Sequence, residues 1–175
     1  MAKLIAGVEL FNLPALKKES MQAKNIGMDK AWQKIQHYCA YQERSHAETR
    51  DKLYKLGLYK QEVESLLTKL IEENYLNEER YAVVFAGGHF RTSQWGKVKI
   101  KYALNQKQVS AYCIKKALAT IDEGEYEKCL EKLAKDKWDS LKMEKNIFTK
   151  KSKLHNYLMQ KGYEGNIIRA IMNKL

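Results

Sequence analysis

The sequence predicts an all-α protein, a tandem array of three three-helix repeats forming an elongated, curved molecule. Helix-favouring residues dominate the composition, with one proline and nine glycines in 175 residues. Apolar residues recur at helical spacing from Asp29 onward. A set of six positions also recurs twice further along the chain, which is typical of stacked repeats that share their buried faces.

Residues 1–28 are predicted to be an N-terminal extension, because they carry no strong period and contain the single proline, Pro14. Whether this extension is ordered or flexible is left open by the sequence. Residues 29–74 are predicted to form the first repeat. Its first helix has apolar groups at i, i+4, i+7 and i+8, and we expect it to end at Arg44 and Ser45.

Two further helices complete the first repeat. Ser45-His46-Ala47-Glu48 is a capping-box pattern, which predicts the start of a short second helix that runs to Leu56. Gly57 then suits the left-handed conformation that commonly closes a helix. A third helix follows, with Val63, Leu66, Leu67 and Leu70 on one face, and ends near Asn74.

The second and third repeats are predicted at residues 75–121 and 122–175. Leu53, Gly57, Leu58, Val63, Leu66 and Leu67 correspond to Leu104, Gln108, Val109, Ile114, Ala117 and Leu118, and then to Leu158, Gly162, Tyr163, Ile168 (or Ile167), Ile171 and Met172. Chance recurrence within an ordinary helical bundle is the competing explanation. The repeat interpretation predicts that all three units stack and share a core.

Positive charge is unevenly distributed along the chain, whose formal net charge is +11. Residues 80–121 hold eight basic groups and residues 145–163 hold five, and neither segment has an acid. Helix faces normally mix both signs, so we interpret this segregation as contact with phosphates. The candidate DNA- or filament-binding residues are Arg91, Trp95, Lys97, Lys99, Lys101, Lys107, Lys150, Lys151 and Lys153.

These candidate residues also have explanations that involve no nucleic acid. The lysines could serve general solubility. Trp95 could stack on an unpaired base, or it could be a core residue that anchors the turn between two helices. Gly87-Gly88 lies inside a helical run, Tyr81 to Phe90, where we expect it to permit close helix packing.

The sequence indicates a binding protein and no enzyme. It contains no phosphate-binding glycine loop, and its four histidines and three cysteines are not at metal-ligand spacing. We therefore predict no catalytic residues, no metal and no cofactor. No apolar run is long enough for a membrane helix, and no signal peptide is recognisable, so we expect a cytoplasmic protein that does not contact membranes.

Three motifs resemble the RecX family. Tyr75-Leu76-Asn77-Glu78-Glu79-Arg80-Tyr81-Ala82 is similar to the family's YL-D-E-R-F-A signature. Arg91, Gly96-Lys97-Val98-Lys99-Ile100 and Leu104 follow its R-(x)n-G-xx-R-I-xx-EL stretch, and Lys161-Gly162-Tyr163 its K-G-F/Y turn. The chain departs from the family at Asn77, at Ala103 and at Gln108, which replaces a glycine.

The resemblance implies a regulator of the RecA recombinase in DNA recombination, DNA repair and the SOS response. Such a protein binds the RecA–DNA filament and inhibits its ATPase, strand exchange and coprotease activities. The expected partners are the RecA filament and single-stranded DNA, with double-stranded DNA as a further candidate, and we expect a monomer. The alternative is a basic helical protein that binds DNA or RNA directly, without a recombinase.

Overall fold

The computed structural model describes residues 25–174 and confirms the predicted fold class. Over that range the chain forms helices and no strand. The helices are α1 (Met28–Tyr41), α2 (His46–Lys55), α3 (Lys60–Glu72), α4 (Glu78–Ser93), α5 (Lys97–Gln106), α6 (Ala111–Ala119), α7 (Glu123–Ser140), α8 (Ile147–Lys161) and α9 (Gly165–Met172). The predicted extension lies outside the described residues, apart from residues 25–28, of which Met28 opens α1.

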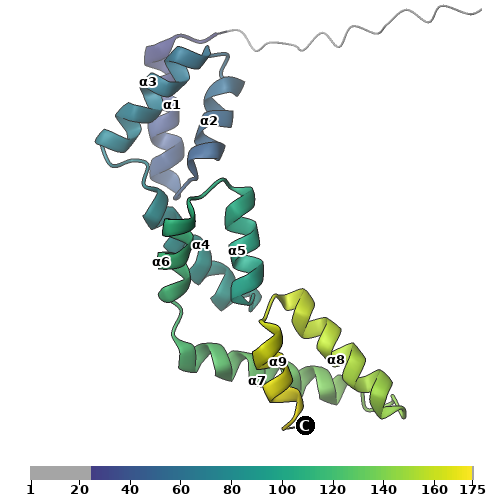
Figure 1. Ribbon diagram of the computed structural model, residues 1–175. Helices are drawn as coiled ribbons and strands as arrows, with labels where there is room; N and C mark the ends of the chain where they lie inside the picture. The colour runs from purple at the N-terminus through teal and green to yellow at the C-terminus, as the bar shows by residue number, and fades with distance from the viewer. Residues whose placement is uncertain (1–24, 175) are drawn as a thin grey trace, which may run out of the picture.

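The helices follow one another in three groups along an elongated, bent molecule (Figure 1). We call α1–α3 unit 1, α4–α6 unit 2 and α7–α9 unit 3. Units 1 and 2 lie end to end, whereas α7 turns away from that direction and carries α8 and α9 on one side (Figure 1). The second helix of unit 2, α5, meets the C-terminal end of α8, the second helix of unit 3.

The repeated positions are equivalent in the structure. Leu53, Leu104 and Leu158 are fully buried at the end of each second helix. Within two residues of the end of each of these helices lies a residue with a positive φ, namely 84° at Gly57, 58° at Gln108 and 91° at Gly162. Gln108 therefore keeps the left-handed turn although it replaces a glycine, at a strain that glycine would not carry.

The last repeated position differs between units. Leu67 is buried, but Leu118 and Met172 are only half-buried, so the expectation that all three are core residues was wrong for two of them. The reason is local. Leu118 is the second-last residue of α6 and Met172 is the last residue of α9, whereas α3 continues for five residues beyond Leu67.

Helix ends also correct the sequence-based boundaries. The first helix ends at Tyr41, earlier than predicted, because Gln42 adopts an extended conformation with φ −161°. The capping box at Ser45 and Glu48 is present as predicted. At α4, Asn77 keeps the capping role of the aspartate that it replaces, since its side chain accepts a hydrogen bond from the Arg80 amide at 2.8 Å.

Gly87 and Gly88 do not serve helix packing as expected. A Cβ atom at Gly87 would lie 2.8 Å from the Arg91 guanidinium, and one at Gly88 would meet nothing within 4 Å. Gly87 therefore gives room to a side chain of its own helix, one turn later.

The described residues form two hydrophobic cores and not the single shared core that was predicted. Units 2 and 3 bury one continuous cluster, from Tyr81 in α4 to Ile171 in α9. Unit 1 has a separate cluster, which Leu76 completes just before α4 begins. Stacking thus merges the apolar faces of the second and third units only.

Candidate nucleic-acid interface

Polar and charged contacts join unit 1 to unit 2 across the gap between their cores. The Lys107 ammonium lies 2.6 Å from the Glu48 carboxylate. The Arg80 guanidinium donates to Glu43 in the connection between α1 and α2, and to the Asn74 side chain at 3.0 Å. Burial alone would raise the pKa of Glu48, but hydrogen bonds from Lys107 and the Ser45 backbone outweigh it and lower that pKa.

The acid-free run of residues 80–121 is therefore not acid-free in space. Four of its eight cations bond carboxylates from elsewhere in the chain: Arg80 with Glu43, Lys97 with Glu123, Lys107 with Glu48 and Lys116 with Glu79. Two of the candidate residues, Lys97 and Lys107, are thereby engaged within the protein. Segregation along the sequence overstated the positive charge that this unit can offer to phosphates.

The junction of units 2 and 3 depends on backbone contact between the start of α5 and the end of α8. The Gly96 amide donates to the Lys161 carbonyl at 2.8 Å, and the Val98 amide to the Gly162 carbonyl at 3.0 Å. A Cβ atom at Gly96 would lie 2.1 Å from the Gly162 oxygen, so this approach requires glycine. The free carbonyls at the end of α8 thus find partners in another unit.

Lysines reinforce the same junction from both sides. Lys99 Nζ donates to the Gln160 carbonyl at 3.2 Å, in the last turn of α8, where the helix dipole favours a cation. In return, Lys161 Nζ donates to the Ser93 carbonyl at the end of α4, also at 3.2 Å. Lys99 therefore joins two units before it meets any partner.

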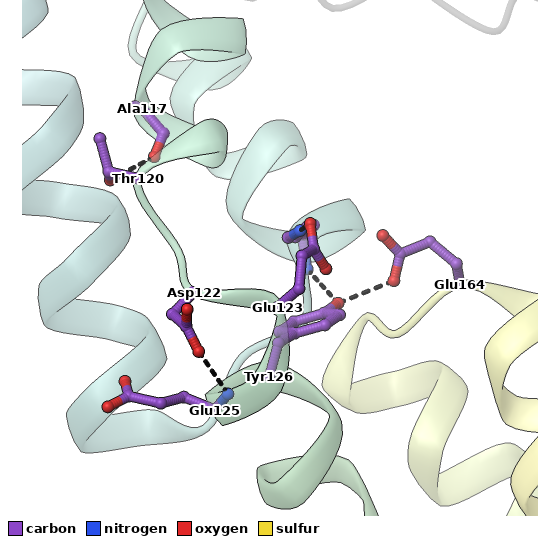
Figure 2. A network of polar contacts seen from close by, with 8 residues as sticks. Ala117, Thr120, Asp122, Glu123, Glu125, Tyr126 and Glu164 are labelled. Atoms are coloured by element: carbon purple, nitrogen blue, oxygen red, sulfur yellow. Dashed lines mark hydrogen bonds and ion pairs between the residues drawn. The ribbon is translucent and has the colours of Figure 1, made fainter.

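The buried Tyr126 lies in a network of polar contacts near Glu123 and Glu164 (Figure 2). Lys97 belongs to the same network. The Tyr126 hydroxyl accepts a hydrogen bond from the Lys97 amide at 2.8 Å and donates one to Glu164 at 2.7 Å. The Lys97 ammonium pairs with Glu123 at 2.5 Å and lies 4.8 Å from the Tyr126 ring centroid. Burial, followed by the nearby carboxylates, raises the pKa of Tyr126, so its hydroxyl stays protonated as the donor.

Trp95 packs as an anchor between α4 and α5. Its ring stacks on His89, with centroids 4.1 Å apart and planes inclined by 9°, and the Lys99 ammonium lies 4.7 Å from its centroid. It is half-buried against the core of units 2 and 3. Burial lowers the pKa of His89, which favours the neutral ring that stacks on Trp95. The geometry thus matches the structural explanation of Trp95, and base stacking stays a prediction.

The other candidate residues lie apart from this junction. Arg91 is exposed on α4 and folds over Gly87 beside a cavity that Asp122 and Glu125 also line. Lys150 and Lys151 lie in the first turns of α8, at the end far from α5 (Figure 1). Lys150 sits 4.0 Å from the Trp138 ring centroid, and nearby Lys153 pairs with Glu144 at 2.7 Å.

Two of the candidate lysines, Lys101 and Lys151, are exposed and without an ion pair among the described residues, and they lie in separate places. Lys101, exposed on α5, is next to the junction, and Lys151, exposed on α8, is at the tip of unit 3. Sequence reasoning missed Tyr126 and the carboxylates of Glu48 and Glu123 as the partners that remove cations from this surface. Glu48 was visible only as a capping residue, because its contact with Lys107 spans 59 residues.

Within residues 25–174, no group of three or more histidine, cysteine or acidic residues is arranged to hold a metal ion. In the same part of the chain, no helix combines the length and apolar character needed to cross a membrane.

Comparison with known proteins relates the chain to one family. The model described as the second three-helix domain of RecX matches residues 77–118, and that described as the third three-helix domain of RecX matches residues 125–172. Together the two matches span just over half of the chain. They coincide with units 2 and 3.

Relatives and solved structures agree with this match. The regulatory protein RecX of Clostridium perfringens (strain 13 / Type A) is 32% identical over 133 residues, which cover 75% of this chain and 62% of that protein. The chain thus spans about three fifths of that relative. The regulatory protein RecX of Thermotoga maritima is 29% identical over 91% of this chain and 92% of its own length.

Two crystal structures share the fold. RecX from Lactobacillus salivarius superposes with a TM-score of 0.77 at 24% identity, over 85% of this chain and 96% of that one. A second structure, of regulatory protein RecX, gives a TM-score of 0.76 at 22% identity, over 83% and 71% of the two chains.

Proposed function

Because the chain belongs to the RecX family, whose members are regulatory proteins, we propose that it binds the RecA–DNA filament and inhibits its ATPase, strand exchange and coprotease activities. The observation that carries this proposal is the match of units 2 and 3 to two successive RecX domains. Recombination, DNA repair and the SOS response are the processes that such inhibition would restrain. Since this proposed partner acts on chromosomal DNA, we place the action in the cytoplasm and assign no catalytic step to this chain.

The shape of the molecule supports filament binding. An elongated, bent array presents its units along a line, so it can contact successive subunits of a helical assembly. Backbone hydrogen bonds and close glycine contact at the junction of units 2 and 3 hold these two units in a fixed relative orientation. We propose that the protein acts as a monomer, with Lys101 and the lysines of α8 toward the filament.

The candidate residues divide into two roles under this proposal. Lys101 and Lys151 are exposed and would meet phosphates directly. Lys150 and Lys153 would join them after leaving the Trp138 ring and the Glu144 carboxylate that they contact in the structure. Lys97, Lys99 and Lys107 would act as positioning residues, because their ammonium groups already bond to other units. Arg91 and Trp95 complete the proposed surface at the edge of α4.

The test is RecA ATPase activity on single-stranded DNA with increasing amounts of this protein. We expect inhibition at substoichiometric or near-equimolar ratio. Lys101→Glu combined with Lys151→Glu should raise the half-inhibitory concentration roughly tenfold, equivalent to about 1.4 kcal/mol. Lys60→Glu combined with Lys30→Glu, at two exposed positions of unit 1, is the charge-matched control and should leave inhibition unchanged.

The double substitution of Lys101 and Lys151 separates an effect on binding from an effect on folding better than charge reversal of Lys97, Lys99 and Lys101 together. A carboxylate at position 97 would face Glu123, and one at position 99 would face the carbonyl end of α8, so both changes would also weaken the junction. ATPase activity that this protein leaves untouched would refute the proposal. Inhibition that the double reversal leaves unchanged would remove Lys101 and Lys151 from the surface.

Direct binding of DNA or RNA without a recombinase is the second candidate function, favoured by the net charge of +11. It predicts tight binding of bare nucleic acid, while RecA ATPase is unaffected. The filament proposal predicts weak, steeply salt-dependent binding of bare DNA.

A further inference from the structure

Unit 1 contains a cavity of about 660 Å³ between α1 and α2 that the proposed function does not use. Six of its lining residues are charged or aromatic: Lys34, His37, Tyr38, Tyr41, Arg44 and Lys52. Its volume lies within the range typical of small-molecule sites. Among the described residues that line it, none is acidic.

Helical spacing explains how these side chains gather. Lys34, His37, Tyr38 and Tyr41 follow at i, i+3, i+4 and i+7, so they form one stripe of α1. A neighbouring stripe, Ala31, Ile35 and Cys39, is buried in the core of unit 1. Lys52 comes from α2, and Arg44 from the connection between the two helices closes one end.

Unlike Arg80 and Lys107, Arg44 and Lys52 face an aromatic ring in this cavity. The Arg44 guanidinium lies over the Tyr38 ring at 4.1 Å from its centroid, and the Lys52 ammonium lies 5.6 Å from the same centroid. Arg44 Nε is buried and has no hydrogen-bond partner among the described residues. A buried donor without a partner is costly, and neither a carboxylate nor a carbonyl of the described residues supplies one for Arg44 Nε.

Tyr41 supplies a second kind of contact. Its side chain is 79% exposed at the rim, although tyrosine rings are usually at least partly covered. The faces of Tyr38 are occupied by cations, whereas Tyr41 has no cation or aromatic ring stacked on it among the described residues. An exposed ring next to cations that form no ion pair among the described residues is the combination with which single-stranded nucleic acids are bound.

We propose that this cavity binds one nucleotide of a single-stranded nucleic acid, with Lys34, Arg44 and Lys52 around the phosphate and Tyr41 stacked on the base. An acidic peptide would match the cations but would leave the Tyr41 ring unused. The site lies in unit 1, outside the surface proposed for the filament. The proposal therefore goes beyond filament binding and does not depend on a recombinase; it assigns a site for the direct nucleic-acid binding named above as the second candidate.

The experiment measures binding of a fluorescein-labelled oligothymidylate to the full chain by fluorescence anisotropy, without recombinase, at several salt concentrations. Tyr41→Ala should weaken binding at least about fivefold, as expected for loss of one stacked base. Arg44→Gln combined with Lys52→Gln should reduce the slope of log affinity against log salt by about 1.4, since each lost contact to a single strand contributes about 0.7.

Matched controls are Tyr59→Ala and Lys60→Gln, which remove an exposed tyrosine and an exposed lysine of unit 1 outside the cavity. Both should bind like the unaltered chain. Because Arg44 is half-buried, thermal unfolding by circular dichroism checks that each variant is folded. If the double variant unfolds, the exposed Lys34→Gln replaces it, with an expected slope change of about 0.7.

Cross-linking adds a direct readout. An oligonucleotide that carries 5-iodouracil should cross-link on irradiation to the peptide containing Tyr38 and Tyr41. The proposal is overturned if the unaltered chain does not bind the oligonucleotide, if the cavity variants bind as the controls do, or if every cross-link falls in units 2 and 3. Binding of oligoglutamate is measured in the same way. If the cavity variants lose oligoglutamate binding but keep oligothymidylate binding, the cavity is a site for an acidic peptide and the proposal is overturned. None of these results alters the ATPase test of filament binding.

Discussion

Tyr126 shows how one hydroxyl can hold two units together. It accepts a hydrogen bond from the Lys97 amide, at the start of α5. It also donates one to Glu164, in the connection between α8 and α9 (Figure 2). Its ring is buried between Phe90 and Tyr163, with centroids at 5.8 and 5.0 Å. The junction therefore requires both the position of the Tyr126 hydroxyl and its protonated form.

Tyr126→Phe keeps the ring and removes the hydroxyl. We expect it to lower the free energy of unfolding by about 1–3 kcal/mol, because the Lys97 amide and Glu164 lose their partner. Urea unfolding measures the change. Tyr102→Phe, at an exposed tyrosine of α5, is the control and should change the free energy by less than about 0.5 kcal/mol. Equal stability of the two variants would show that this hydroxyl contributes nothing to the junction.

The left-handed residues give opposite predictions for two substitutions. Gly162→Ala should destabilise the protein by at least about 2 kcal/mol, since φ is 91° and the new Cβ would lie 2.2 Å from that of Lys99. Gln108→Gly should instead stabilise it by up to about 1 kcal/mol, because glycine relieves a φ of 58° at an exposed position. Thermal unfolding measures both, and the same sign for both changes would contradict the explanation.

Local patterns made some residues predictable and left others hidden. Ser45 and Glu48 lie three residues apart, so their capping box could be recognised from the sequence alone. Lys97 and Glu123 are 26 residues apart, and no local signal pairs them. The candidate surface therefore stays a prediction, and two of its cations, Lys97 and Lys107, prove to be ion-paired within the protein.

Among the elements, the contact between α2 and the residue that follows α5, Lys107, depends on ionised Glu48. Its lowered pKa means that the folded protein favours the carboxylate over the acid. The stability that this group contributes is therefore present above its ordinary value of 4.5 and is lost as pH falls through the lower value of the folded state.

Glu48→Gln should make the free energy of unfolding depend less on pH in the acidic range. At neutral pH we expect it to cost about 1 kcal/mol, since the amide cannot pair with Lys107 as a carboxylate does. Below the folded pKa of Glu48 the difference from the unaltered chain should shrink toward zero. Urea unfolding from neutral to acidic pH measures this difference. Exposed Glu72→Gln is the control, and a difference that grows on acidification would contradict a lowered pKa of Glu48.

The presence and order of the helices could be predicted, because the spacing of apolar residues depends on the sequence of each helix alone. The end of α1 could not, since Gln42 leaves the helix where the capping box of α2 must begin. The role of Gly87 was also hidden, because it depends on the direction that Arg91 takes one turn later.

At the scale of the whole molecule, two cores predict two cooperative units. Ile35 is fully buried in unit 1 and Leu154 in the core that units 2 and 3 share. Each replacement by alanine should cost about 2–5 kcal/mol. Ile35→Ala should speed amide hydrogen exchange in α1–α3 only, and Leu154→Ala in α4–α9 only. Exchange that rises throughout the chain in either variant would indicate a single cooperative unit.

The number of units was predictable, but the way in which they join was not. The six repeated positions report packing inside each unit, which is why Leu53, Leu104 and Leu158 were found. Contacts between units use other residues, which differ from one junction to the next: Lys107 with Glu48 at the first, and Gly96 with Gly162 at the second. A repeat in the sequence carries no information about such differences.

The two junctions should respond differently to electrolyte. Mobile ions screen the attraction between partly exposed charges, but they reach a backbone-to-backbone contact closed by glycine far less. Added salt should therefore loosen the hold on the α1–α3 segment and leave the remaining two thirds stiff. A polyanion surrounded by condensed counterions would raise the salt concentration locally in the same way. Near such a target, α1–α3 would therefore change orientation more readily, while α4–α9 would stay rigid.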